Sequence, residues 1–569
     1  MKAKFLRKCC PFPVQRVATL FAGNLRVAFK TCCVVLLLLT IPLAHAAEVE
    51  DFIPKESVLY VKLQDIDEVY GEIEISENWE KALALLQDLS DWREMQQGLV
   101  MFQGMLGTDL SDIIETVGYR TALAVWLDEA DSSQRQIGIV IHSGGNLDTL
   151  RQLTKIVEGF LGIGNETTLR LDAGVYQRVR YNVLEGLDSP LKYGFVDEYL
   201  VIGAGEGSFE KLLDTYRTDL PSIQQKPEFA KGLEKIGSGE VIVYANVPHV
   251  LPAMEGSLDR WMRAHFPIFK SVFGQLNLLE TGPFLQVAVE YDLNLPENEI
   301  GMFLKEGQRL KTLNALSGED DLFVTVAPKV VESIWKSVPT SDAAEGISFL
   351  EGLMNLDLEE DIMTGLTGEL ALSIPDLTHF DPEALSGFRF EFDGSIELDA
   401  GDVQTNGGLV FNSSNRMKWD QIGNSLSNLQ NASVSQTDYK GATVSAVSSN
   451  IFYSEVDGLF LIGFSENQMY ALIDTIKRKK KPPYLKQLPK TPTAFAQLNL
   501  ARVLEFEKGA LPADKLLVNS KEMPRLLTWL SVEGDAAVLE MTISEETPIE
   551  MLAKLVPFFI WNMDVIWWE

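Results

Sequence analysis

The sequence predicts an α+β fold made of two homologous tandem halves, each a largely antiparallel sheet with covering helices. The main observation is a stretch that occurs twice without a gap. Tyr193–Thr215 reads YGFVDEYLVIGAGEGSFEKLLDT, and Tyr453–Thr475 reads YSEVDGLFLIGFSENQMYALIDT. Each copy has the pattern of a strand, a tight turn, a strand and a helix. Asp197 and Asp457 hold the same place in the expected hairpin turn, where an aspartate accepts backbone hydrogen bonds.

The elements expected on either side of the first copy are mostly strands joined by hairpins and interrupted by helices. Alternating apolar residues at Leu59, Val61 and Leu63 predict the first strand, and a helical pattern follows and continues through residues 76–107. The remaining patterns predict strands at 121–127 and 135–144, a helix at 146–161, a hairpin at 167–182, a strand with a short helix at 239–254, and a regular period-2 strand at 284–293.

The same order of blocks begins again after residue 313. The blocks that match earlier ones lie at residues 316–326, 357–374, 407–414, 439–450, 453–475, 494–506 and 532–548. Their unbroken order indicates a tandem duplication with loop insertions, the largest at residues 375–406. We therefore expect a first half at 47–307 and a second half at 308–556, sharing one topology.

The first 46 residues have the features of a secretory signal peptide. Residues 1–30 contain seven lysines or arginines and no acid, an apolar run follows, and Ala44-His45-Ala46 supplies a small-x-small cleavage site. The apolar run is short for a membrane span. We expect cleavage before Ala47 and a periplasmic or secreted protein, with an uncleaved anchor as the competing interpretation.

Composition limits the chemistry of the mature chain. All four cysteines (Cys9, Cys10, Cys32 and Cys33) lie in the signal segment, so the rest of the chain has no disulfide, thiol nucleophile or cysteine metal site. Without the seven basic residues of that segment, 42 positive and 81 negative charges remain. Such an acidic surface disfavours nucleic acid and anionic headgroups as partners.

The start of the mature chain carries a family resemblance. Residues 53–73 read IPKESVLYVKLQDIDEVYGEI, and they precede repeated strand-and-helix units in a cysteine-free exported chain. In these features the chain resembles the uncharacterised family of secreted bacterial proteins catalogued as domain of unknown function 3352. The resemblance implies an extracytoplasmic bacterial protein and transfers no catalytic residue.

The motifs that could carry chemistry have simpler structural interpretations. Gly203–Ser208 reads GAGEGS between a strand and a helix, but it lacks the last glycine and the βαβ unit of a dinucleotide site, so we interpret it as a turn and helix cap. The second copy, Gly463–Gln468, keeps one glycine and is interpreted as a capping box. The four histidines after the signal segment have no metal-ligand spacing, and neither have the acids of the 375–406 insertion. The basic run at 477–481 is interpreted as a solvated helix end, with contact to an acidic surface as the alternative. We therefore predict no catalytic residue, cofactor or metal.

The sequence thus favours a non-enzymatic extracytoplasmic envelope protein that acts as a scaffold or binding surface. The alternative is a periplasmic carrier of lipid or another apolar ligand, held between a curved sheet and its helices. An enzyme is the less favoured interpretation. The expected partner is an envelope protein or an apolar ligand of unknown identity.

Residues 557–569 form an additional hydrophobic tail that has no counterpart in the first half. The tail reads PFFIWNMDVIWWE and is too short to span a membrane. Packing on the second half and docking into a partner or a membrane surface are both open for it. The candidate docking residues are Phe558, Phe559, Trp561, Trp567 and Trp568.

Overall fold

The computed structural model describes most of residues 48–555, and the predicted signal segment and tail lie outside this range. Internal gaps of one to three residues occur, and the longer ones cover residues 87–95, 128–134, 162–167, 252–265, 293–303, 331–368, 378–387, 391–395, 399–406, 413–433 and 503–523. The chain divides into two compact units. Unit 1 contains the residues up to Ser257 and Ser271–Leu279, and unit 2 contains Leu258–Lys270 and the residues from Glu280 onward.

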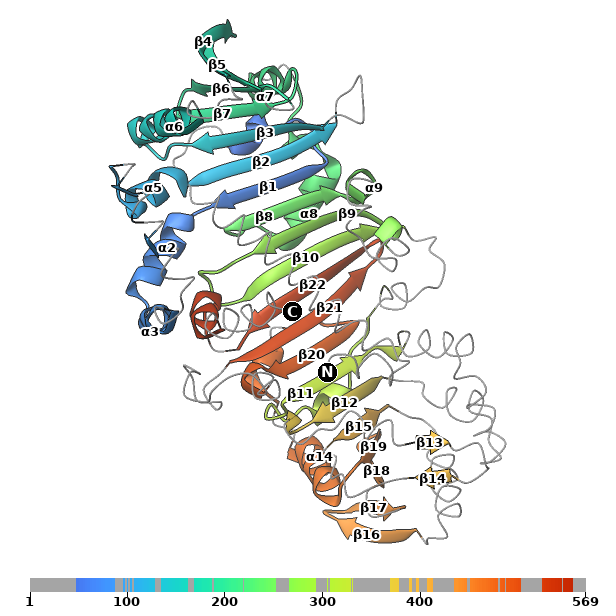
Figure 1. Cartoon of the computed structure of the whole chain (residues 1–569). Helices are drawn as coiled ribbons and strands as arrows, with labels where there is room; N and C mark the ends of the chain where they lie inside the picture. The colour runs from blue at the N-terminus through green and yellow to red at the C-terminus, as the bar shows by residue number, and fades with distance from the viewer. Residues whose placement is uncertain are drawn as a thin grey trace. The chain divides into compact units, whose positions relative to one another are not determined.

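Unit 1 is built on an antiparallel sheet with the strand order β4-β5-β6-β7-β3-β2-β1-β8-β9 (Figure 1). Its strands are β1 (Leu59–Gln64), β2 (Arg120–Leu127), β3 (Arg135–His142), β4 (Thr168–Tyr176), β5 (Val179–Glu185), β6 (Leu191–Val196), β7 (Tyr199–Ala204), β8 (Val241–Asn246) and β9 (Phe269–Leu276).

The helices of unit 1 fall into two groups. The 3-10 helix η2 (Val49–Phe52) and helices α7 (Ser208–Tyr216) and α8 (Pro227–Ile236) close one side of the sheet, which we call the back face. Helices α2 (Ile66–Ile75), α5 (Leu110–Val117) and α6 (Leu147–Leu161) lie together along one end of the central strands (Figure 1). The remaining helices are α3 (Glu77–Leu86), η3 (Ile223–Gln225) and α9 (Val247–Val250).

Aromatic rings and small residues fill the core on the back face. Phe229 of α8 packs edge-on against Tyr60 of β1 and Tyr244 of β8, with ring centroids 5.4 and 5.7 Å apart. Phe52 of η2 stacks on Tyr216 of α7 at 4.0 Å. Four of these five side chains, all but Tyr216, are at most 2% exposed. This face therefore supplies the main core of unit 1.

Unit 2 also consists mainly of antiparallel sheet, with the order β16-β17-β18-β19-β15-β12-β11-β20-β21-β22-β10. Its strands are β10 (Pro283–Tyr291), β11 (Leu322–Val326), β12 (Leu370–Ile374), β15 (Gly408–Phe411), β16 (Ser435–Tyr439), β17 (Ala442–Ala446), β18 (Phe452–Val456), β19 (Leu459–Gly463), β20 (Ala494–Asn499), β21 (Arg525–Glu533) and β22 (Ala536–Ile543). Strands β13 (Phe388–Phe390) and β14 (Ile396–Leu398) pair separately. Its helices are η5 (Phe266–Ile268), η6 (Thr312–Ala315), α14 (Glu466–Arg478) and η11 (Pro483–Lys486). Residues 548–555 are also α-helical.

The predicted fold class is wrong. Twenty of the twenty-two strands in the described residues belong to these antiparallel sheets, and the protein is predominantly sheet rather than α+β. The described residues do not form a clear arrangement of two α+β halves. An apolar stripe on a helix shows that the helix packs, but not whether it forms a layer over a sheet or borders its end.

Within these sheets, the strand connections of the two units are equivalent. The order in unit 1 is β4-β5-β6-β7-β3-β2-β1-β8-β9. It matches, strand by strand, the order β16-β17-β18-β19-β15-β12-β11-β20-β21 in unit 2. The repeated stretch forms β6, β7 and α7 in unit 1, and β18, β19 and α14 in unit 2. Similar local patterns therefore form similar connections.

The predicted hairpin turns in the repeated stretch are confirmed. Asp197 and Asp457 have φ angles of 50° and 51°, in the left-handed region that aspartate tolerates in tight turns. A glycine at or next to the end of the second strand of each copy lets the following helix approach. A Cβ atom on Gly203 would lie 2.3 Å from the Phe209 backbone nitrogen, and one on Gly463 would lie 3.1 Å from Met469.

Candidate binding surface

Buried charges connect η2 to the back face of the unit 1 sheet. Lys62 of β1 lies 2.9 Å from the Glu50 carboxylate, and the two side chains are 8% and 9% exposed. Arg120 of β2 donates a hydrogen bond to Glu48 at 2.7 Å. A buried cation is stable only with a nearby anion. The first described residues of the chain therefore neutralise two cations of the sheet, and this network is structural.

His142 at the end of β3 lies beside this network. Its Nδ1 atom accepts a hydrogen bond from the Gly144 backbone N–H at 2.9 Å, and the edge of its ring meets Tyr199 at a centroid distance of 4.5 Å. Burial lowers the pKa of His142 below its ordinary value of 6.5; Glu198 opposes this effect and Arg120 adds to it. The side chain is therefore held as a neutral imidazole in the core.

Replacing His142 with asparagine is expected to reduce the pH dependence of stability. The folded protein binds the His142 proton less tightly than the unfolded chain, so this residue lowers the free energy of unfolding as the pH falls below about 6.5. Asparagine is a fitting replacement because Asn412 follows β15 at the equivalent place in unit 2. Urea denaturation at about pH 7.5 and about pH 5.5 should show a smaller difference for His142→Asn than for the wild type. The exposed His249 provides the control variant His249→Asn, and equal pH dependence in all three proteins would contradict the assignment.

The opposite side of the unit 1 sheet, which we call the front face, is also apolar. Directly paired residues form three rows across five strands. The rows are Val241, Leu63, Thr121, Ile141 and Leu200; Val243, Val61, Leu123, Ile139 and Ile202; and Ala245, Leu59, Val125, Ile137 and Ala204. Fourteen of these fifteen residues are aliphatic, so the strands are apolar on both sides.

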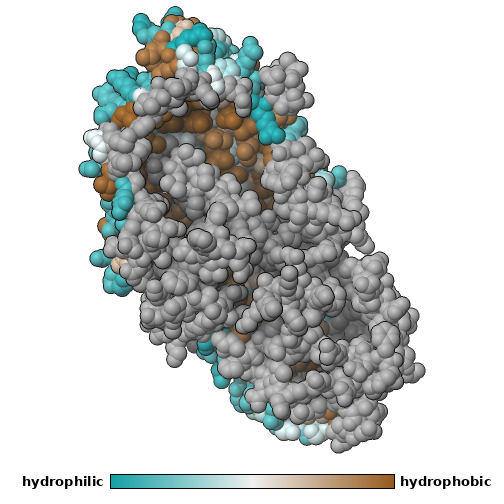
Figure 2. Space-filling model, in the orientation of Figure 1, coloured by the Kyte–Doolittle hydropathy of each residue, from teal (hydrophilic) through white to brown (hydrophobic). Residues whose placement is uncertain are grey.

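The two faces of the sheet differ in the exposed fraction of their side chains. The alternating residues that point to the back face, such as Ala122, Val140 and Ile242, are at most 2% exposed. Every residue of the second and third rows is partly exposed, and Ile137 reaches 38%. Figure 2 shows apolar side chains gathered in a hollow over unit 1. An antiparallel sheet normally presents polar residues on a face that meets water, so this surface is unusual for a solvated one.

Acidic helices border the first row of the front face. Ile66 of α2 packs with Leu63 and Val241, while Val117 of α5 packs near Ile141 and Leu200. The segments that carry these contacts, 65–75 and 109–117, contain no basic residue. Their acids, which we call the acidic rim, are Asp65, Asp67, Glu68, Glu72, Glu74, Asp109, Asp112 and Glu115.

The carboxylates at the start of α2 affect one another. Burial raises the pKa of Glu68, and repulsion from Asp65 and Asp67 raises it further. Burial also raises the pKa of Asp65, against the attraction of Arg120. A positive charge placed at this rim would relieve the repulsion between the carboxylates.

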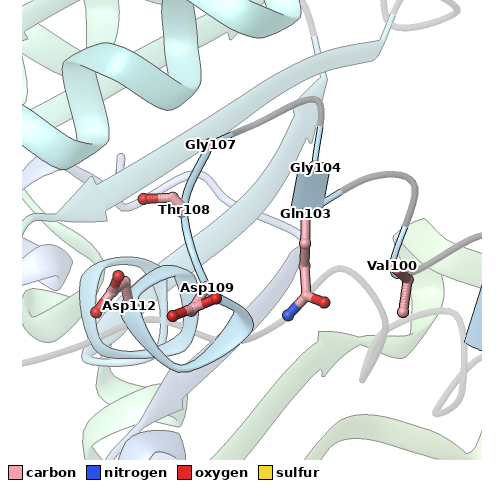
Figure 3. A pocket seen from close by; sticks show the side chains of 7 residues that line it. All are labelled: Val100, Gln103, Gly104, Gly107, Thr108, Asp109 and Asp112. Carbon is pink, nitrogen blue, oxygen red and sulfur yellow. The ribbon is translucent and has the colours of Figure 1, made fainter.

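A small open pocket adjoins the N-terminal end of α5 (Figure 3). It has a volume of about 330 Å³ and is lined by Val100, Gln103, Gly104, Gly107, Thr108, Asp109 and Asp112. Its polar side chains include two carboxylates, one amide and one hydroxyl, and no base. Chemically, the pocket suits an ammonium or guanidinium group better than an anion.

The structure places the sequence motifs in ordinary structural roles. Gly203–Ser208 forms the turn before α7, as predicted, with Gly207 at the helix N-cap. In the second copy the Ser465 hydroxyl accepts a hydrogen bond from the Gln468 backbone N–H at 3.2 Å, which confirms the predicted cap. The tail residues proposed for docking (Phe558, Phe559, Trp561, Trp567 and Trp568) lie outside the described residues, so their role stays a prediction.

Two further features concern the described residues alone. Within them, no group of three or more histidine, cysteine, aspartate or glutamate side chains is arranged to hold a metal ion. None of the helices in the same part of the chain is both long enough and apolar enough to cross a membrane.

Comparisons with known proteins leave the family of this chain open. No protein-family model matches the sequence, and no curated protein matches it. Among solved structures, the crystal form I structure of TP0453 matches 44% of this chain and 97% of its own, with 12% sequence identity and a TM-score of 0.20. A similarity of that size carries no argument about fold or function.

Neither the front face nor the acidic rim is among the features predicted from the sequence. Both left signals in the chain. The stretches 121–127 and 137–141 are almost entirely apolar, where a half-solvated strand would alternate, and residues 65–75 contain five acids and no base. The signals were separate in the sequence, and only strand pairing placed them beside each other. Together they offer apolar contact and negative potential, which suits binding.

Proposed function

We propose that this chain is a non-enzymatic extracytoplasmic binding protein, and that the front face of unit 1 is its binding surface. One observation carries the proposal: an aliphatic surface that spans five strands remains partly exposed, although the back face already supplies the core. Apolar surface left in water costs free energy, so its persistence favours an interaction that covers it.

The size of the driving force supports a binding role. Each roughly 100 Å² of apolar surface removed from water contributes about 2.5 kcal/mol before the costs of association. The loss of translational freedom and the ordering of side chains consume much of this. The rigid hydrogen-bonded sheet adds little ordering cost on this side.

The proposed location rests on the N-terminal segment. Its basic start, apolar run and Ala44-His45-Ala46 site support export, and the absence of cysteine after residue 33 agrees with a chain held together by its core. The resemblance of residues 53–73 to secreted bacterial proteins points the same way. The acidic net charge of −32 disfavours nucleic acid as a partner.

Replacing Ile137 with aspartate is expected to weaken binding of an apolar probe at least about tenfold, because a carboxylate would be covered without a partner. The 38% exposure of Ile137 lets the aspartate reach water in the free protein, so folding should persist. The measurement is a fluorescence titration with Nile red, a neutral dye, together with a urea denaturation curve.

Val157 of α6 provides the matched control, because it is 55% exposed but lies outside the three rows. Val157→Asp should bind Nile red as the wild type does. If both variants bind like the wild type, or if the wild type does not bind the dye, the front face is not the binding surface.

A further inference from the structure

Resting on the proposed binding surface, we infer that the front face of unit 1 receives a basic amphipathic helix of a partner protein. The apolar side of that helix covers the aliphatic rows, and its lysines and arginines face the acidic rim. The inference comes from the juxtaposition of the two surfaces: the apolar rows are bordered by α2 and α5, whose exposed side chains include Glu68, Glu72, Glu74, Asp112 and Glu115.

The spacing of the rows suits a helix that lies across the strands. Neighbouring strands are about 4.8 Å apart, so each row presents an aliphatic side chain at roughly that interval. An α-helix presents apolar residues at i, i+3, i+4 and i+7, one turn being about 5.4 Å. A partner helix parallel to a row therefore places one apolar group over each strand, and five strands need about 16 residues.

The charges decide which flank of the partner is basic. The acidic rim follows the first row, where Leu63 packs with Ile66 of α2, and where Ile141 and Val117 of α5 pack against the same buried cluster. A helix lying on the rows would turn one polar flank toward these carboxylates. Lysine or arginine on that flank pairs with the rim, whereas glutamate would meet like charge.

The pocket beside α5 extends the same negative surface. Asp109 and Asp112 lie on it with the amide of Gln103, and Val100 offers an apolar edge that is 67% exposed (Figure 3). A long basic side chain combines an apolar stem with a cationic end, which matches this lining. The pocket thus gives the rim a defined place for one lysine or arginine.

The same charges argue against two other occupants. Phospholipids and fatty acids with anionic headgroups would bring negative charge to the acidic rim. A second copy of this chain, with a net charge of −32, would also bring mostly negative charge. A basic amphipathic segment satisfies both the aliphatic rows and the rim.

The test uses two fluorescent helical peptides of about 18 residues, one made of leucine and lysine and one of leucine and glutamate. Fluorescence anisotropy with the purified protein should show binding of the lysine peptide, weakening as salt is raised, and at least about tenfold weaker binding of the glutamate peptide. Asp112→Asn/Glu115→Gln should weaken the lysine peptide about three- to tenfold and leave Nile red binding unchanged.

The control Glu206→Gln/Glu234→Gln removes two exposed charges near α7 and on α8, and it should bind the lysine peptide like the wild type. Equal affinity for both peptides, or equal effects of the two double variants, would overturn the inference. So would tighter binding to anionic phospholipid vesicles than to the lysine peptide, which would favour a lipid carrier.

Failure of the peptide tests with Nile red binding intact removes this inference alone, while loss of Nile red binding removes the proposed function as well.

Discussion

Replacing Glu50 with alanine is expected to lower the free energy of unfolding by about 3–5 kcal/mol, the usual cost of leaving a buried charge without its partner. Glu50 lies 2.9 Å from Lys62, and both side chains are almost fully buried between η2 and β1. The ammonium group of Lys62 would keep only Glu48, whose carboxylate is 3.8 Å away. Urea denaturation followed by tryptophan fluorescence and far-UV circular dichroism measures the loss.

A double variant and a surface variant define the cause. Glu50→Ala/Lys62→Met should recover most of the loss, because it removes the buried cation together with the anion. Glu77→Ala breaks the pair between Glu77 and Lys81, which is 2.6 Å long but exposed on α3, and it should leave the unfolding curve unchanged. A Glu50→Ala curve that coincides with the wild type would show that η2 does not anchor unit 1 through this pair.

Replacing Gly203 with alanine is expected to cost about 2–3 kcal/mol, the upper part of the range for overpacking a close contact. The new Cβ would lie 2.3 Å from the backbone nitrogen and 2.6 Å from the Cα of Phe209, and backbone atoms cannot rotate away as a flexible side chain can. Helix α7 must therefore shift on the sheet. The same denaturation measurement applies.

Gly71 in α2 provides the opposite expectation, since no atom lies within 4 Å of its added Cβ. Gly71→Ala should be neutral or should stabilise the protein by up to about 1 kcal/mol, because alanine loses less conformational freedom in a helix. If the two substitutions have the same effect, the close approach of α7 to β7 is not what requires glycine at position 203.

The features that the sequence predicted correctly depend on neighbouring residues. The turns at Asp197 and Asp457 follow from two residues between apolar strands, and the cap at Ser465 follows from the residue three places later. These patterns involve contacts over a few positions, so a single chain contains all the information they need.

The incorrect prediction was the α+β fold class, because it depended on contacts between distant segments. The apolar stripe of a helix does not state which surface the helix will meet. Strand pairing is equally hidden, since β10 pairs with β22, which lies about 250 residues further on. Nothing in the local pattern of residues 283–291 distinguishes one strand partner from another.

The sequence by itself determined the local elements: the strands, the hairpin turns, the helix caps and the acidic, cysteine-free character of the chain after residue 46. The tertiary structure alone decided that Glu50 neutralises Lys62, and that the aliphatic rows lie beside the acidic rim. The reason is that each of these features needs segments from separate parts of the chain, and hydrogen bonding between strands is what places them next to each other. Every strand offers the same kind of backbone donors and acceptors, so the sequence of one strand alone cannot name the neighbour whose side chains complete its surface.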